Sequence, residues 1–192
     1  MRSERQTRGG ATRFETREEN GKKKIEGYFA VFDSNYEIFD GATESIDRHA
    51  FDGALDGDIR ALIDHETRLV LGRTTAGTMT LRVDEHGLWG SIEINEQDSD
   101  AMNLYARVQR GDVSQCSFGF DILQERTDVD PGTGAVHWTI KRVKLYEVSC
   151  VTFPAYKETA ISARAEEYQE IQKRQIELWK ERMKARLKKE WH

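Results

Sequence analysis

Three side chains that together support hydroxyl-based nucleophilic chemistry lie in or directly after apolar runs of this sequence. His65 follows the apolar run 61–63. Ser117 lies within the run 116–120, and Glu147 lies in a late strand-like segment. A serine nucleophile needs a base, and the base benefits from a third group that orients it. The three residues are therefore candidates as a set, although none of them is specific alone.

Each candidate also has an ordinary structural interpretation. His65 is flanked by two acidic residues, as a surface histidine in an acidic patch would be. Ser117 can donate to a neighbouring backbone carbonyl, which is the commoner role of a serine in a strand. Glu147 can be an exposed strand residue. Gly119 lies on the same face of its strand as Ser117, so its missing side chain leaves room beside the hydroxyl.

Other kinds of site are not indicated by the sequence. The five histidines and two cysteines show no pair at metal-ligand spacing, and the glycines form no phosphate-binding loop. We therefore expect no metal and no other cofactor. The formal net charge is -5, whereas nucleic-acid binders are usually basic, so no nucleic-acid partner is expected.

The sequence also lacks membrane signals. No apolar stretch reaches the roughly 18–20 residues that cross a bilayer. The charged first segment has no apolar core of the kind found in signal peptides. We therefore expect a soluble intracellular protein with no membrane contact.

The chain divides by composition into three regions. Residues 1–23 are polar and rich in both charges, which indicates a flexible N-terminal arm. Residues 24–163 alternate apolar runs with turn signals, and we expect them to form the whole core. Residues 164–192 contain neither Gly nor Pro, and their apolar residues recur every three or four positions, which predicts an amphipathic C-terminal helix.

The middle region predicts an α+β fold. Short connections between its elements favour an antiparallel sheet, and we expect a mostly antiparallel β-barrel with a few surrounding helices. The predicted elements are strands at 24–33, 59–65, 112–123 and 137–149, a hairpin at 77–94 that turns at 84–87, a short helix at 45–55, and a helix that starts at Asp98 or Ser99 and ends at Gly111.

Three motifs occur in order along the chain: Asp-His65-Glu followed by Leu71-Gly72-Arg73, then residues 110–120, then residues 146–156. In this order they resemble the motifs of the prohead proteases of tailed bacteriophages. Further agreement comes from segment 26–32 and from Ala50-Phe51, so the resemblance spans about residues 25–162. This coverage makes the match far more specific than a lone short motif.

The resemblance implies a serine endopeptidase with a fold similar to that of the herpesvirus capsid-maturation protease. Carried over by motif, His65 is the base, Ser117 the nucleophile and Glu147 the orienting third member. Ser114 is the alternative nucleophile; in a regular strand its side chain points to the face opposite that of Ser117, so only one of them can meet His65. Cys116 is a weaker third candidate, because its apolar neighbours do not activate a thiol.

The resemblance also implies a biological role in capsid maturation. The expected reaction is cleavage of the scaffolding protein, or of the scaffolding segment of the major capsid protein, together with self-cleavage. The expected partners are the major capsid protein and its scaffolding segment or a separate scaffold, with a homodimer as a further alternative. The expected location is the interior of the phage prohead, which assembles in the bacterial host cytoplasm. An alternative from another class is a non-catalytic capsid-assembly or scaffold-binding protein that retains the protease barrel.

The C-terminal helix lies outside this resemblance. Its apolar positions allow packing on the domain, association with a helical scaffold, or dimerisation as a short coiled coil, and their spacing leaves these alternatives open. These positions are Tyr168, Ile171, Ile176, Trp179, Met183 and Leu187.

Overall fold

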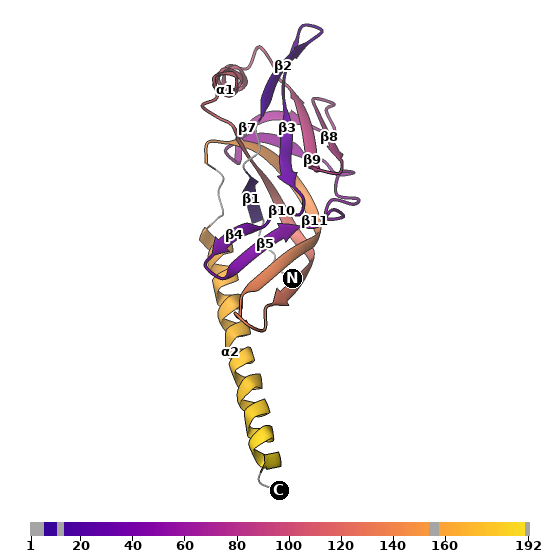
Figure 1. Ribbon diagram of the computed structural model, residues 1–192. Helices are drawn as coiled ribbons and strands as arrows, with labels where there is room; N and C mark the ends of the chain where they lie inside the picture. Colours follow the sequence, from indigo (N-terminus) through magenta and orange to yellow (C-terminus); the bar gives the residue numbers. More distant parts are fainter. Residues whose placement is uncertain (1–5, 11–13, 154–157, 191–192) are drawn as a thin grey trace.

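The computed structural model describes residues 6–10, 14–153 and 158–190, which form an α+β fold with two β-sheets and two helices. In Figure 1, the strands form one body, and helix α2 (Glu158–Glu190) extends away from it. Helix α1 (Ser99–Arg110) lies at the opposite end of this body. The α+β class predicted from the sequence is therefore confirmed.

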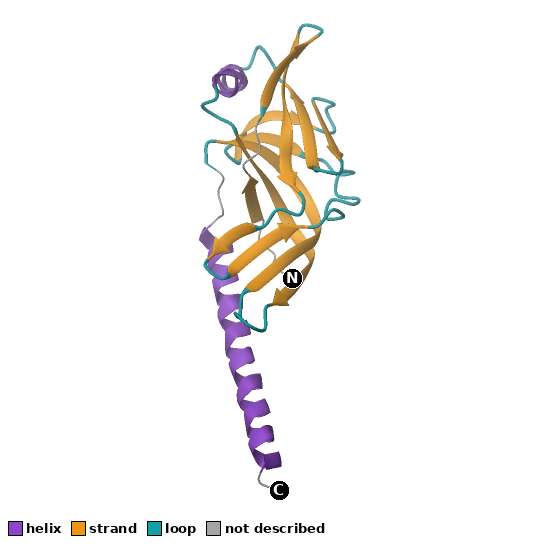
Figure 2. Cartoon of the chain, viewed as in Figure 1, coloured by secondary structure: helices purple, strands orange, loops and turns teal. Residues whose placement is uncertain are grey.

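Two separate sheets account for the strands (Figure 2). The first has the order β1-β10-β11-β5-β4, with β6 pairing with β11 and β7 with β6. Its strands are β1 (Gln6–Gly10), β10 (Gln115–Val129), β11 (Val136–Val151), β5 (Ala42–Ile46), β4 (Tyr36–Phe39), β6 (Arg60–Ile63) and β7 (Glu66–Arg73). The second has the order β2-β3-β9-β8, with β2 (Glu15–Glu19), β3 (Lys22–Val31), β9 (Gly87–Glu93) and β8 (Met79–Val83).

The expected barrel is wrong. Among the strands that the structure describes, every pairing lies within one sheet or the other, so the sheets do not close on each other. The second edge of β11 is shared by two short parallel neighbours, β5 and β6, rather than by one long strand that could continue around a barrel. The alternation of apolar and polar residues along a strand cannot distinguish a closed barrel from two packed sheets, because both architectures bury one face of each strand.

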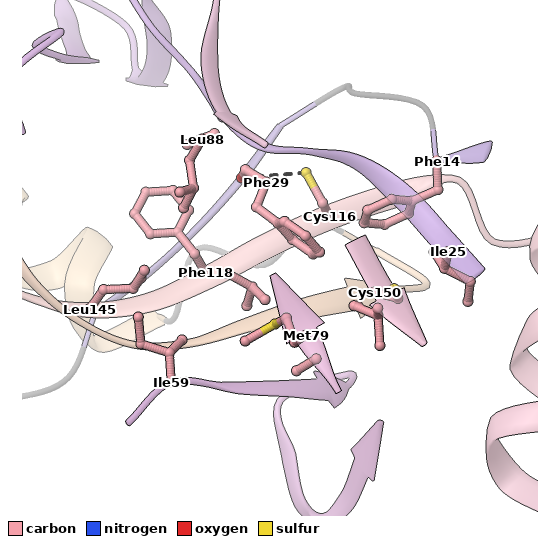
Figure 3. Close-up of a cluster of buried hydrophobic side chains, with 14 of the residues drawn as sticks. Phe14, Ile25, Phe29, Ile59, Met79, Leu88, Cys116, Phe118, Leu145 and Cys150 are labelled. Atoms are coloured by element: carbon pink, nitrogen blue, oxygen red, sulfur yellow. Dashed lines mark hydrogen bonds between the residues drawn. The ribbon is translucent and has the colours of Figure 1, made fainter. Parts of the chain in front are cut away.

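The main hydrophobic core is built from buried side chains of both sheets (Figure 3). Phe29 and Leu88 come from the second sheet, whereas Phe118 and Leu145 come from the long strand pair of the first. The thiol of Cys116 is buried in the same core and donates to the carbonyl oxygens of Tyr28 and Phe29. This core fixes the β10–β11 pair, on which Ser117 and Glu147 lie.

Two local predictions are confirmed, and one is wrong. The hairpin at 77–94 is formed by β8 and β9, and α1 begins after Asp98, whose carboxylate accepts from two backbone N–H groups. Gly111 ends α1 with a φ of 89°, a left-handed conformation that suits glycine. The short helix expected at 45–55 is replaced by the end of β5 and a series of turns, in which Ala50 N–H donates to the Asp47 carbonyl.

The described residues of the N-terminal region, 6–10 and 14–23, include two paired strands, although composition predicts a flexible arm over 1–23. Of this region, β1 is paired with β10 and β2 with β3, so both strands extend the sheets. Gln6, Thr7 and Arg8 are buried although their side chains are polar. Their burial depends on partners distant in the sequence, which composition alone does not reveal.

The first turns of α2 pack against the first sheet through a buried arginine. Arg164 is fully buried and donates to Glu44 at 2.8 Å and to Glu125 at 2.6 Å. Its guanidinium also lies over the ring of Trp138, 4.6 Å from the centroid. Burial opposes ionisation of Glu44, but the guanidinium groups of Arg8 and Arg164 hold the pKa of that carboxyl below its ordinary value. This part of the helix therefore belongs to the folded domain.

Contacts of α2 with the first sheet and its turns continue as far as Gln172. Tyr168 packs edge-to-face on Phe39 with ring centroids 5.4 Å apart, and Gln172 donates to the Gly134 carbonyl at 2.6 Å. From residue 173 to residue 187 all side chains are exposed. The amphipathic stripe expected from the sequence is therefore divided between a packed half and an exposed half.

We predict that Arg164→Ala lowers the free energy of unfolding by about 3–5 kcal/mol, because it leaves buried Glu44 with one guanidinium fewer. Denaturant melts of the purified chain measure this difference. Arg182→Ala, in the exposed half of the same helix, is the matched control and should leave stability essentially unchanged. Equal stability of the two variants would contradict a structural role for the Arg164 cluster.

Candidate active site

Antiparallel pairing of β10 with β11 places four site residues on one face of the first sheet. Ser117 pairs with Ser149, and Gly119 pairs with Glu147. Residues two positions apart in a strand point to the same face, so the two serines, the glycine and the glutamate form a square of neighbours. Ser149 was not among the residues predicted from the sequence. The two-residue spacing of Glu147 and Ser149 within a predicted strand is the signal that would have placed them on one face.

Glu147 is the centre of this arrangement. Its side chain is 4% exposed, and its Oε1 accepts from His65 Nδ1 at 2.7 Å. Its Oε2 accepts from Ser149 Oγ at 2.6 Å. Because a carboxylate only accepts, this contact places a proton on Nδ1 of His65 and leaves Nε2 as the acceptor nitrogen. The structure therefore brings together His65 and Glu147, as expected from the sequence, and adds Ser149.

Gly119 makes room for the Glu147 carboxylate. A side-chain carbon at residue 119 would overlap Glu147 Oε1, and it would also lie within 3.1 Å of Cγ. From the sequence, the missing side chain is expected to leave room beside the hydroxyl of Ser117. In the structure, the Glu147 carboxylate takes this space.

His65 lies in a two-residue turn between β6 and β7, rather than at the end of a strand. Both turn residues have left-handed backbones, with φ of 47° at Asp64 and 61° at His65. Asp and His adopt this conformation more readily than most non-glycine residues, and it suits a tight hairpin. The Asp64 carboxylate accepts from the backbone N–H of Thr152 at 2.7 Å and from its hydroxyl at 3.2 Å. These contacts fix the turn to the chain that follows β11.

Ser117 is fully buried, and its hydroxyl donates to the backbone carbonyl of Arg8 at 2.9 Å. The hydrogen bond expected between Ser117 and His65 is therefore not formed. Within the described part of the chain, His65 Nε2 is buried without a hydrogen-bond partner. The reason is that β1 covers β10 and supplies another acceptor to the serine.

The two alternative nucleophiles lie elsewhere. Ser114 precedes β10 and is half-buried, and it makes no hydrogen bond to His65. Cys116 neighbours Ser117 in the strand, so its thiol points to the opposite face, into the core. Burial also raises the pKa of the nearby Cys150 thiol, which pairs with Cys116 across the strands.

A pocket lies beside the candidate site. Residues Arg60, Leu62, Thr67, Tyr146 and Glu147 line a pocket next to the buried carboxylate. Among the residues that the structure describes, no group of three or more His, Cys, Asp or Glu side chains is arranged to hold a metal ion. In the same residues, neither helix is long and apolar enough to span a membrane.

Comparison of the sequence with family models places the chain in a class of viral serine proteases. The chain belongs to the caudovirus prohead serine protease family, whose model matches residues 12–174. A solved structure that resembles it is the bacteriophage T4 capsid assembly protease, gp21, with 10% sequence identity and a TM-score of 0.46. That match covers 77% of this chain and 99% of the T4 chain. No curated protein matches the sequence. The family inferred from the sequence motifs is thus confirmed.

We predict that Gly119→Ala displaces Glu147, breaks its hydrogen bond to His65, and destabilises the fold by about 1–3 kcal/mol. Proton NMR should show loss of the downfield Nδ1–H signal of His65. Gly57→Ala is the matched control, because a side-chain carbon at residue 57 meets no atom within 4 Å. An unchanged imidazole signal in Gly119→Ala would show that Glu147 does not depend on this glycine.

Proposed function

We propose that this protein is a serine endopeptidase in which Ser117 is the nucleophile, His65 the general base, and Glu147 the residue that orients His65. The observation that carries the proposal is the 2.7 Å hydrogen bond from His65 Nδ1 to buried Glu147. It leaves His65 Nε2 as an acceptor with no partner in the described structure. Membership of a serine protease family supports the same assignment.

In the proposed reaction, His65 Nε2 takes the hydroxyl proton while Ser117 Oγ bonds to the carbonyl carbon of a peptide. The carbonyl π electrons move to oxygen, then return as the C–N bond breaks, and the leaving amine receives the proton from His65. Water then attacks the acyl-serine ester in the same way and restores Ser117 and His65. Glu147 accepts from Nδ1 throughout and stabilises the imidazolium.

The proposed substrate is the scaffolding protein, or the scaffolding segment of the major capsid protein, inside the phage prohead in the host cytoplasm. Self-cleavage accompanies this maturation. Family membership supports the assignment, because the family is that of prohead proteases. Co-expression with the major capsid protein tests it. The capsid protein should lose mass with the wild-type chain and keep its full length with Ser117→Ala.

The proposed catalytic domain is residues 24–163, extended by β1, β2 and the first turns of α2. The extension is supported by the pairing of β1 with β10 and of β2 with β3, and by the burial of Arg164. The exposed half of α2 carries Ile176, Trp179, Met183 and Leu187, which are between 37% and 61% exposed. Apolar side chains exposed in this number usually mark a contact. Association with the scaffold, or with a second copy as a homodimer, is the proposed role of this half.

A non-catalytic scaffold-binding protein is the second candidate function. One observation favours it, since Ser117 is fully buried and bonded to Arg8 rather than to His65. In that case neither the capsid protein nor a scaffold loses mass in the co-expression experiment, either with the wild-type chain or with Ser117→Ala. Cleavage that depends on Ser117 would reject this candidate.

We predict that Ser117→Ala and His65→Ala each lower kcat/KM for a scaffold-derived peptide by about 10³–10⁶-fold, because the two act as one unit. The double variant should be little slower than either single one. Ser114→Ala is the matched control and should retain nearly the wild-type rate. Loss of activity in Ser114→Ala together with retention in Ser117→Ala would move the nucleophile to Ser114.

We predict that Glu147→Gln lowers kcat by roughly 10²–10⁴-fold, less than the loss caused by Ser117→Ala, because the amide no longer holds the useful tautomer of His65. Asp64→Asn is the matched control, since the Asp64 carboxylate is bonded to Thr152 and not to His65. A wild-type rate in Glu147→Gln would leave a Ser–His dyad or assign the third role to Asp64.

A further inference from the structure

Strand β1 occupies the open edge of the strand that carries Ser117. It runs antiparallel to β10, with Arg8 paired with Phe118 and Gly9 paired with Ser117. Peptides commonly bind to a sheet by adding a strand to such an edge, where backbone hydrogen bonds supply affinity. The position of β1 is therefore the position in which an extended substrate would meet Ser117.

The backbone carbonyl nearest the candidate nucleophile belongs to Arg8. Ser117 Oγ donates to this carbonyl oxygen at 2.9 Å. A hydroxyl whose proton points at the carbonyl does not give it to the base, and the bond to His65 is missing. Strand β1 thus lies in the register of a bound substrate strand. It differs from a reactive substrate because the Ser117 hydroxyl proton points at the Arg8 carbonyl oxygen and not at His65.

The Arg8 side chain lies in a buried acidic pocket. It is 2% exposed, and its guanidinium donates to both carboxylate oxygens of Glu44, with Oε2 at 3.0 Å. It also donates to the Gln6 side chain at 2.9 Å and lies over the ring of Phe120, 5.6 Å from the centroid. A planar guanidinium with two donors to one carboxylate is a geometry that lysine cannot reproduce.

The carboxylates around the Arg8 side chain outnumber the positive charge that Arg164 supplies to them. Glu44, Glu125 and Glu167 contribute three negative charges, and Arg164, which is bonded to all three, contributes one positive charge. Without Arg8 the cluster therefore has a charge of about -2, and with Arg8 about -1. Removing the cation would leave buried Glu44 with fewer partners, which is costly.

We propose that the edge of β10 beside Ser117 is the substrate-binding edge, that β1 occupies it in the resting protein, and that Glu44 selects an arginine at the residue whose carbonyl faces Ser117. This inference rests on the proposed protease function. It identifies the substrate class as extended segments with arginine on the amino side of the scissile bond. It also identifies β1 as a covering strand that such a segment must displace.

Binding measurements test the specificity without requiring catalysis. The full chain with Arg8→Ala and Ser117→Ala is titrated with a labelled peptide of the sequence SERQTRGGAT, which is that of residues 3–12. A second peptide has alanine in place of the second arginine. The arginine peptide should bind with a Kd about 10-fold or more lower than that of the alanine peptide, as for a buried charge pair. Glu44→Gln should abolish the preference, and Glu44→Asp should retain part of it. Equal affinities for the two peptides would overturn the proposal.

Activity measurements test the covering role of β1. Full-length Arg8→Ala should cleave the same arginine peptide about 10-fold or more faster than the wild-type chain, because its β1 is held less tightly. Arg17→Ala, at an exposed arginine of β2, is the matched control and should leave the rate unchanged. Thermal melts check that each variant is folded. A rate in folded Arg8→Ala equal to that of the wild type would show that β1 is only a structural strand.

The two proposals fail in different ways. If no variant cleaves any peptide but the arginine preference in binding is present, the serine protease function fails and the arginine-selecting edge stands. If cleavage depends on Ser117 but neither Arg8 nor the peptide arginine affects rate or affinity, the protease function stands and the inference is wrong.

Discussion

A single buried carboxylate, that of Glu147, is the constraint on which the candidate site depends. A carboxyl group withdrawn from water is stable only when its oxygens are hydrogen-bonded. Glu147 meets this requirement through His65 on one oxygen and Ser149 on the other. Its position is available only because residue 119 has no side chain. Three segments distant in the sequence must therefore be in register before this polar cluster can be buried at an acceptable energy.

The long strand β11 connects this cluster to the second buried polar group of the protein. Near its start, β11 pairs with β5, which carries Glu44, and near its end it pairs with β6, which precedes His65. Strand β1 contacts both groups, since the Arg8 carbonyl accepts from Ser117 and the Arg8 side chain binds Glu44. The N-terminal strand, the first turns of α2 and the candidate nucleophile are thus joined through one strand pair, which explains why Arg8 and Arg164 are buried.

The sequence predicted those features that depend on local pattern or on motif order. Helix α1 with its caps, the β8–β9 hairpin and the family follow from spacing within short windows. Features that depend on long-range pairing were not predicted. Composition makes residues 1–23 look like a flexible arm, because the partner of Arg8 lies 36 residues away in Glu44. The two-sheet architecture was mistaken for a barrel for the same reason, since strand order is not encoded in alternation.

The left-handed backbone at His65 restricts which residues can replace it. A β-branched side chain is strained at a φ of 61°, whereas asparagine adopts this conformation with little cost. Substitution His65→Asn therefore removes the imidazole while retaining the turn that joins β6 to β7. Asparagine, aspartate and glycine are the replacements that remove the imidazole and remain compatible with this backbone. If His65 is the general base proposed above, the folded His65→Asn chain leaves the capsid and scaffold proteins uncut, so that its place in an uncleaved particle can be determined.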